Sequence, residues 1–312
     1  MLKLGIELAV VAGLMSGLAQ AGENWYPSRY GAEDTIGAAN NLSPEKVRKA
    51  AELVKTGKTY SLAIETSRAT PAYSPRSFQL FVVPSGDGTG QSLGVNQLTG
   101  NDDMLLTWLG IGTQIDGLGH VGINHRYYNG NHAHDFVDPQ GLKKFGTHTI
   151  PPIVTRGVLL DMASYFGAGL VHEGTAYNRK EIQAAAGRQG VTIQKGDVVI
   201  FHSGWMQLLG KEDKRWLDVH PGLGTEGARY LADLGVVAVG ADTPALEVIP
   251  FEDPNKPFPV HQTLLTKNGV YVLENIRTEE LVHDGAHEFL FVLGQPKFVG
   301  AVQMVINPIA IR

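Results

Sequence analysis

The feature that most constrains the fold is a series of short apolar runs, several of them continuous rather than alternating with polar residues. Continuous apolar runs are typical of strands that are covered on both faces of a sheet. We expect strands at residues 78–83, 104–109, 157–162, 197–201, 236–240, 270–273, 289–293 and 302–306.

Helix signals are fewer and separate some of these runs. Ser43 can cap a helix that Gly57 would close, because glycine favours the position just after a helix end. Asn178 and Glu181 have capping-box spacing, and another helix should start at Thr225. Many strands and few helices predict an α/β fold with a mixed central sheet, in one domain that spans residues 22–312.

Composition excludes several chemistries. The 312 residues include no cysteine, so disulfides, cysteine-bound zinc, iron–sulfur clusters and a cysteine nucleophile are ruled out. The net charge of −5 argues against a nucleic-acid partner, because phosphate binding needs clustered Lys and Arg. The chain also contains neither a G-x-S-x-G elbow nor an H-E-x-x-H motif.

The N-terminus has the pattern of a secretory signal. Lys3 precedes an apolar run at residues 8–18, and Ala19-Gln20-Ala21 is a small-x-small cleavage pattern. The run is shorter than the roughly 20 residues of a membrane span. We expect residues 1–21 to be a signal peptide and the mature protein to be periplasmic, without a membrane anchor. Glu7, just before the apolar run, is unusual for a signal peptide. The alternative is therefore an N-terminal helix that docks on the protein.

A glycine-rich segment at residues 85–90 follows an expected strand and superficially resembles a phosphate-binding turn. No helical apolar stripe follows it. We therefore expect a loop and not a dinucleotide site.

One candidate site lies at residues 112–120. Gln114 and Asp116 are two apart, so on an extended backbone they project to the same side. The following glycines, Gly117 and Gly119, could turn His120 back toward them. The alternative is a polar strand end with an exposed histidine.

A second candidate site is His261 with Glu274, which ends the apolar strand at residues 270–273. A carboxylate at the end of a buried run is costly unless it is paired or bound to a metal. The alternatives are a salt bridge with Arg277 and a solvated loop histidine. Asp242 also ends an apolar run, but we favour a turn cap there over a ligand.

These residues resemble a known family. Residues 110–120 are similar to the H-x-G-T-H-x-D-x-P-x-H signature of the metal-dependent cyclase/hydrolase family, which includes kynurenine formamidase, isatin hydrolase and trans-dienelactone hydrolase. The resemblance extends over most of the mature chain, through segments at 28–38, 156–161, 196–205, 220–223, 240–244 and 261–275. It implies a swivelling β/β/α-type fold and a homo-oligomer, a dimer or a tetramer.

The sequence departs from the signature where Gly110 and Gln114 replace its first two histidines, and where its proline is lost within residues 117–119. In formamidase-like members those histidines serve one metal of a two-metal site. The resemblance therefore implies a single divalent ion, Zn or Mn, on Asp116, His261 and Glu274. Gln114 would be a fourth ligand or would hold the metal-bound water.

The resemblance also implies that His120 is the catalytic imidazole. If His120 binds the metal instead, His125 or Asp242 would have to act as the base. Aromatic walls for a small-molecule substrate could come from Trp108, Trp205, Tyr127 or Tyr128.

The leading hypothesis is a metal-dependent hydrolase of a cyclic amide, lactone or aryl-formamide. One alternative is a lyase or dehydratase that uses the same metal. The other is a periplasmic binding protein whose metal site has decayed, which the changes at Gly110 and Gln114 would favour.

Overall fold

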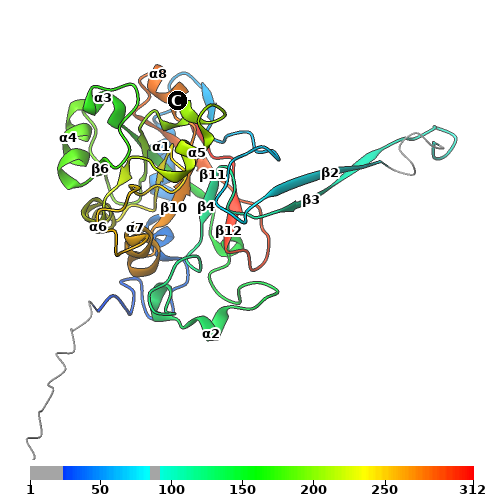
Figure 1. Cartoon of the computed structure of the whole chain (residues 1–312), viewed down its shortest axis with the longest axis horizontal. Coiled ribbons are helices and arrows are strands. Elements are labelled where there is room, and N and C mark those ends of the chain that lie inside the picture. Colours follow the sequence, from blue (N-terminus) through cyan, green and yellow to red (C-terminus); the bar gives the residue numbers. More distant parts are fainter. Residues whose placement is uncertain (1–23, 85–91) are drawn as a thin grey trace, which may run out of the picture.

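The computed structural model describes residues 24–84 and 92–312. Its core is a nine-stranded mixed sheet in the order β1-β13-β11-β5-β7-β9-β10-β4-β12 (Figure 1). The expected α/β class, with a swivelling β/β/α-type architecture and a mixed central sheet, is confirmed. The signal peptide predicted at residues 1–21 and the loop predicted at residues 85–90 lie outside the described residues.

Four parallel strands form the middle of the sheet, and the flanking strands run antiparallel. The parallel strands are β5 (Ile153–Asp161), β7 (Val198–His202), β9 (Ala238–Ala241) and β10 (Tyr271–Glu274). All residues of β7, β9 and β10 are buried, as their continuous apolar runs predicted. The flanking strands are β1 (Thr59–Ser61), β4 (Gln114–Asp116), β11 (Glu288–Leu293), β12 (Gln303–Val305) and β13 (Ile309–Ile311).

The helices are short. They are α1 (Pro44–Ala51), α2 (Ala133–Phe136), α3 (Met162–Phe166), α4 (Arg179–Gln189), α5 (Asp213–Asp218), α6 (Thr225–Leu234), α7 (Pro259–His261) and α8 (Glu279–His283). Helix α4 packs against α3 and α6. A π-helix, Gln262–Lys267, continues α7, and a small sheet joins β6 (Ala176–Tyr177) to β8 (Gly222–Leu223). No helix in the described part of the chain is both long enough and apolar enough to cross a membrane.

The expected caps of the helices are present, with one exception. The Ser43 side chain accepts the Lys46 amide, and Asn178 and Glu181 form the capping box of α4. Gly57, however, does not close α1, which ends six residues earlier at Ala51. After Ala51 the backbone amides of residues 52–54 bond to carbonyls three residues back, so the α-helix gives way to tighter turns before β1, which pairs antiparallel with β13 at the edge of the sheet.

Strands β2 (Phe78–Pro84) and β3 (Asn101–Thr107) lie outside the central sheet and pair only with each other. They form a long ribbon that projects from the body of the molecule (Figure 1), and we call these two strands the arm. Its apolar side chains are exposed, among them Leu80, Phe81, Val82, Val83, Met104, Leu105 and Leu106. The expectation that these two runs are covered on both faces is therefore wrong within a single chain.

Candidate metal centre

The register of the three-residue strand β4 places four polar side chains on one face of the sheet. Gln114 lies opposite Glu274 of β10, and Asp116 lies opposite Gln303 of β12. Directly opposed residues share a face, and so do residues two apart on one strand. The expectation that Gln114 and Asp116 project together is confirmed, with the Gln114 amide nitrogen 3.4 Å from Asp116 Oδ1.

Asp116 is fully buried, and its two carboxylate oxygens have different surroundings. Oδ1 accepts a hydrogen bond of 2.7 Å from Nε2 of Gln303. Oδ2 has no hydrogen-bond donor among the described residues and lies 3.5 Å from Nε2 of His261. Burial raises the pKa of this carboxyl, but the nearby His120 and His261 rings outweigh burial and hold the pKa below its usual value.

His261 ends α7, and its ring is oriented by a buried carboxylate, Glu247. Nδ1–H of His261 donates to Oε1 of Glu247 at 2.5 Å, and this carboxylate also accepts the backbone amides of Val260 and His261. Nε2 then faces Oε1 of Glu274 at 3.2 Å. Burial lowers the pKa of His261, but its contacts with Asp116, Glu247 and Glu274 outweigh burial and raise the pKa well above its ordinary value.

Glu274 lies at the carboxyl end of β10 and is buried. Its Oε2 accepts a hydrogen bond of 2.6 Å from Nε2 of Gln114, so the amide nitrogen of Gln114 faces the carboxylates. Burial and the charge of Asp116 raise the pKa of Glu274. No ion pair joins Glu274 to Arg277, the alternative that the sequence had left open, among the described residues.

The donor set fits a divalent cation. The ligand atoms of Asp116, His261 and Glu274 all lie within 4.8 Å of one another. Bonds of about 2.0–2.2 Å to a tetrahedral ion place neighbouring ligand atoms roughly 3.3–3.6 Å apart, close to the 3.2 and 3.5 Å measured from Nε2 of His261. Glu247 holds a proton on Nδ1 of His261, so a bound cation would replace only the proton on Nε2, and the Nε2 lone pair would then face the ion between the two carboxylates.

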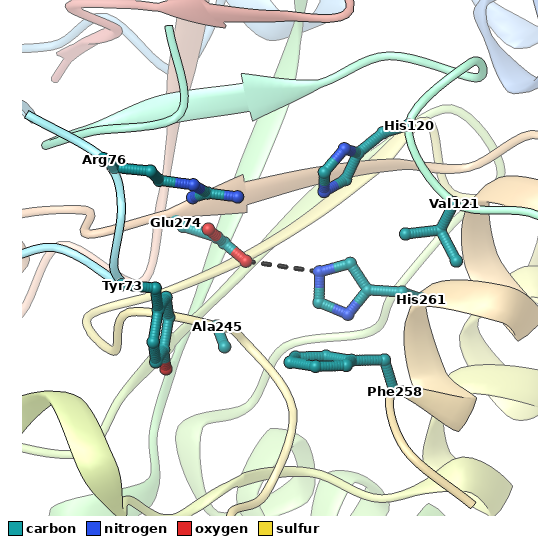
Figure 2. Close-up of a pocket in the computed structure, with 8 residues that line it drawn as sticks. All are labelled: Tyr73, Arg76, His120, Val121, Ala245, Phe258, His261 and Glu274. Atoms are coloured by element: carbon teal, nitrogen blue, oxygen red, sulfur yellow. Dashed lines mark hydrogen bonds and ion pairs between the residues drawn. The ribbon is translucent and has the colours of Figure 1, made fainter. Parts of the chain in front are cut away.

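His120 stands at the edge of this cluster, with Nε2 3.9 Å from Asp116 Oδ2. It lines a cavity of about 270 Å³ together with His261 and Glu274 (Figure 2). Burial lowers the pKa of His120, which favours the neutral ring that can accept a proton. The remaining lining residues are Tyr73, Arg76, Val121, Ala245 and Phe258.

Other residues singled out in the sequence lie elsewhere. Asp242 is a buried cap that accepts hydrogen bonds from Ser203 and from the backbone amide of Trp205, as we had favoured. His125 does not line the cavity, so the structure does not place it as a base there. The walls that we expected from Trp108, Trp205, Tyr127 and Tyr128 come instead from Tyr73 and Phe258.

Glu247 and Gln303 are two residues of the candidate site that sequence reasoning missed. A signal for Glu247 is present, since this carboxylate stands between the apolar residues Leu246 and Val248. Gln303 lies in an expected strand, but its pairing with β4 is not evident from the sequence. A Cβ atom on Gly110 would lie 2.4 Å from Oε1 of Gln303, so glycine at 110 leaves room for the side chain that binds Asp116.

Comparisons with known proteins agree with this fold. The family model "Cyclase", described as "Putative cyclase", matches residues 60–248, more than half of the chain. A crystal structure described as a novel cyclase is 28% identical with a TM-score of 0.82, and the match covers 93% of this chain and 99% of that one. A search of curated proteins found no match.

Two more distant structures share the fold. Isatin hydrolase A from Ralstonia solanacearum is 18% identical with a TM-score of 0.63, over 82% of this chain and 92% of that one. A predicted metal-dependent hydrolase from Bacillus stearothermophilus is 17% identical with a TM-score of 0.53, over 82% and 98%. At these identities the likeness extends to the fold alone.

The role of Glu247 can be tested by the substitution Glu247→Gln. Glutamine keeps the size of the side chain but removes the negative charge. In the native protein this charge orients the His261 ring and raises its pKa. We expect the affinity for Zn²⁺ or Mn²⁺ to fall roughly 10–100-fold. Competition with a chromophoric chelator measures this affinity, and Glu52→Gln, on an exposed residue, is the matched control. An unchanged affinity in a folded Glu247→Gln protein would show that Glu247 does not support the site.

Proposed function

Because the chain belongs to the cyclase family, we propose that it is a metal-dependent hydrolase of a cyclic amide, a lactone or an aryl-formamide. The observation that carries this proposal is the buried group of Asp116, His261 and Glu274, whose ligand atoms converge beside a cavity of small-molecule size. The fold shared with isatin hydrolase A and with a metal-dependent hydrolase supports it.

We propose one ion per chain, Zn or Mn. Two carboxylates and one imidazole form a donor set that suits either metal. A second ion has fewer ligands available, because Gly110 offers no side chain and Gln303 fills the space beside it. Gln114 holds the Glu274 carboxylate in place through its amide nitrogen. When bound, the ion would polarise a carbonyl and lower the pKa of a water molecule toward ~7.

His120 is the group we propose to move the proton. Its ring lines the cavity, and Asp116 lies 3.9 Å from its Nε2. A neutral imidazole can take a proton from the attacking water and return it to the leaving group. The rings of Tyr73 and Phe258 provide flat surfaces for the substrate.

We expect His120→Ala to retain its metal but to lose about 10²–10⁴-fold in turnover, because general acid–base help of this kind is lost. His261→Ala should lose both metal and activity. Metal analysis of the purified proteins and a screen of lactones, formamides and isatin-like lactams test this, with His134→Ala as a control outside the cavity. If His120→Ala emptied the site, His120 would be a ligand and not the base.

The same screen in ¹⁸O-labelled water distinguishes hydrolysis from its alternatives. Hydrolysis puts solvent oxygen into the new carboxylate, whereas a lyase or dehydratase does not. A protein that takes up less than about 0.2 equivalents of any divalent ion would instead be a binding protein with a decayed site, because a working site of this kind binds its metal tightly.

We further propose that two copies of the chain associate through the arm. A two-stranded ribbon alone is marginally stable, and this one exposes apolar side chains on both faces. At the base of the arm lies a groove of about 680 Å³, where Val137, Phe298 and Val299 are exposed. The arm of each copy can cover the groove of the other, which gives a closed two-fold interface. Two strands of seven residues plus the groove approach the roughly 20–30 residues a side of a stable interface.

The double substitution Val82→Asp with Leu105→Asp places charges on one face of the arm, so we expect it to convert a dimer or larger oligomer into a monomer. Size-exclusion chromatography with light scattering measures the mass. Gln183→Asp, on the exposed side of α4, serves as the control. A wild-type protein that is monomeric at all concentrations, or a variant with the wild-type mass, would contradict the arm interface.

We also propose that residues 1–21 direct export and are removed after Ala21, because they have the charged, apolar and small-residue regions of a signal peptide. N-terminal sequencing of the protein from the periplasm should then read Gly22-Glu23-Asn24. An intact Met1 in the cell-soluble fraction would contradict export.

A further inference from the structure

Arg76 is a cation in the wall of the candidate cavity, and no carboxylate of the described residues forms an ion pair with it. It lies just before the arm and is half-buried. One of its nitrogens, Nη1, donates a hydrogen bond of 2.6 Å to the backbone carbonyl of Gly110. No other hydrogen bond and no ion pair of its side chain is found within residues 24–84 and 92–312. Since a guanidinium carries five N–H donors, most of them remain available.

The hydrogen bond to Gly110 fixes where the guanidinium points. Figure 2 shows it extending into the cavity between Tyr73 and His120, toward the carboxylate of Glu274. The charge of Arg76 acts on Glu274, but the two groups are not in ion-pair contact. Arg76 is therefore held in place by a backbone carbonyl, and no carboxylate of the described residues is hydrogen-bonded to it.

None of the three buried carboxylates of the site is hydrogen-bonded to the guanidinium. A divalent ion would offset the carboxylates of Asp116 and Glu274, and the third buried carboxylate, Glu247, is committed to His261 and the backbone. A half-buried cation beside a cavity of about 270 Å³ is then complemented best by an anionic group of the ligand.

The other walls define the body of that ligand. Tyr73 and Phe258 present rings, and Val121 and Ala245 present small apolar surfaces. Such walls favour a planar, mostly apolar group. A negatively charged substituent on that group could pair with Arg76. A guanidinium binds a carboxylate through two parallel hydrogen bonds, which also fixes the orientation of the ring.

We propose that the substrate is an aryl or cyclic amide or ester that carries a carboxylate, and that Arg76 binds this carboxylate. The inference rests on the proposed hydrolase function for the identity of the scissile bond, but not for the anion-binding role of Arg76. The alternative is that Arg76 only donates its hydrogen bond to the Gly110 carbonyl and does not bind the ligand.

The test uses matched anionic and neutral compounds. For binding, benzenesulfonate is compared with methyl phenyl sulfone by calorimetry on the metal-loaded protein, because a sulfonate pairs with guanidinium but is a poor metal ligand. For turnover, 2-formamidobenzoate is compared with formanilide. The variants are Arg76→Gln, Arg76→Lys and, as a control outside the site, Arg188→Gln.

We expect the wild-type protein and Arg188→Gln to bind the sulfonate at least 10-fold more tightly than the sulfone. Arg76→Gln should lose this preference while it keeps its affinity for the sulfone and its metal content. Arg76→Lys should retain part of the preference. In turnover, Arg76→Gln should raise KM for 2-formamidobenzoate at least 10-fold more than it raises KM for formanilide.

The outcomes separate this inference from the proposed function. A preference that survives in Arg76→Gln, or an equal loss for anionic and neutral compounds, would overturn the role of Arg76. If the role of Arg76 were overturned in this way, hydrolysis of formanilide by both the wild-type protein and Arg76→Gln would still support the hydrolase proposal. Arg76-dependent binding of the sulfonate without hydrolysis of any amide or ester would support the anion site and contradict the hydrolase.

Discussion

The structure depends on the balance of charge around His261. Asp116, Glu247 and Glu274 are all buried, and each has an oxygen within 3.5 Å of a ring nitrogen of this imidazole. Burying ionised carboxylates is costly unless they are paired, and one imidazole cannot balance three of them. Glu247 is satisfied by the backbone and by Nδ1 of His261. The other two carboxylates are those of Asp116 and Glu274, and one oxygen of Asp116 has no hydrogen-bond donor among the described residues. A bound cation would balance the charge of these two groups.

The sheet brings these groups together by strand register rather than by proximity in the sequence. Asp116 and Gln303 are hydrogen-bonded although 187 positions separate them, because β4 pairs with β12 on one side and with β10 on the other. A shift of one residue in β4 would turn Gln114 and Asp116 to the opposite face. The buried Ile115, which points away from the site, opposes such a shift because it would lose its place in the core.

The sequence alone could predict the strands and much of the site for one physical reason. Burial on both faces leaves a continuous apolar run, and a carboxylate at the end of such a run, such as Glu274, is conspicuous. Gln303 could not be identified in this way, since its role depends on which strand lies next to β4. The arm shows the same limit, because the apolar run at residues 78–83 predicted a strand covered on both faces, whereas the single chain leaves its side chains exposed.

The position of the arm in the chain connects these features. Tyr73 and Arg76 line the cavity immediately before β2, and Gly110, whose carbonyl holds Arg76, follows β3 within a few residues. Both ends of the ribbon thus continue into segments that line or support the site. The apolar surface that a single chain leaves uncovered and the charge that faces the cavity therefore belong to neighbouring segments of the chain, because the same ribbon connects Arg76 to the glycine that holds it.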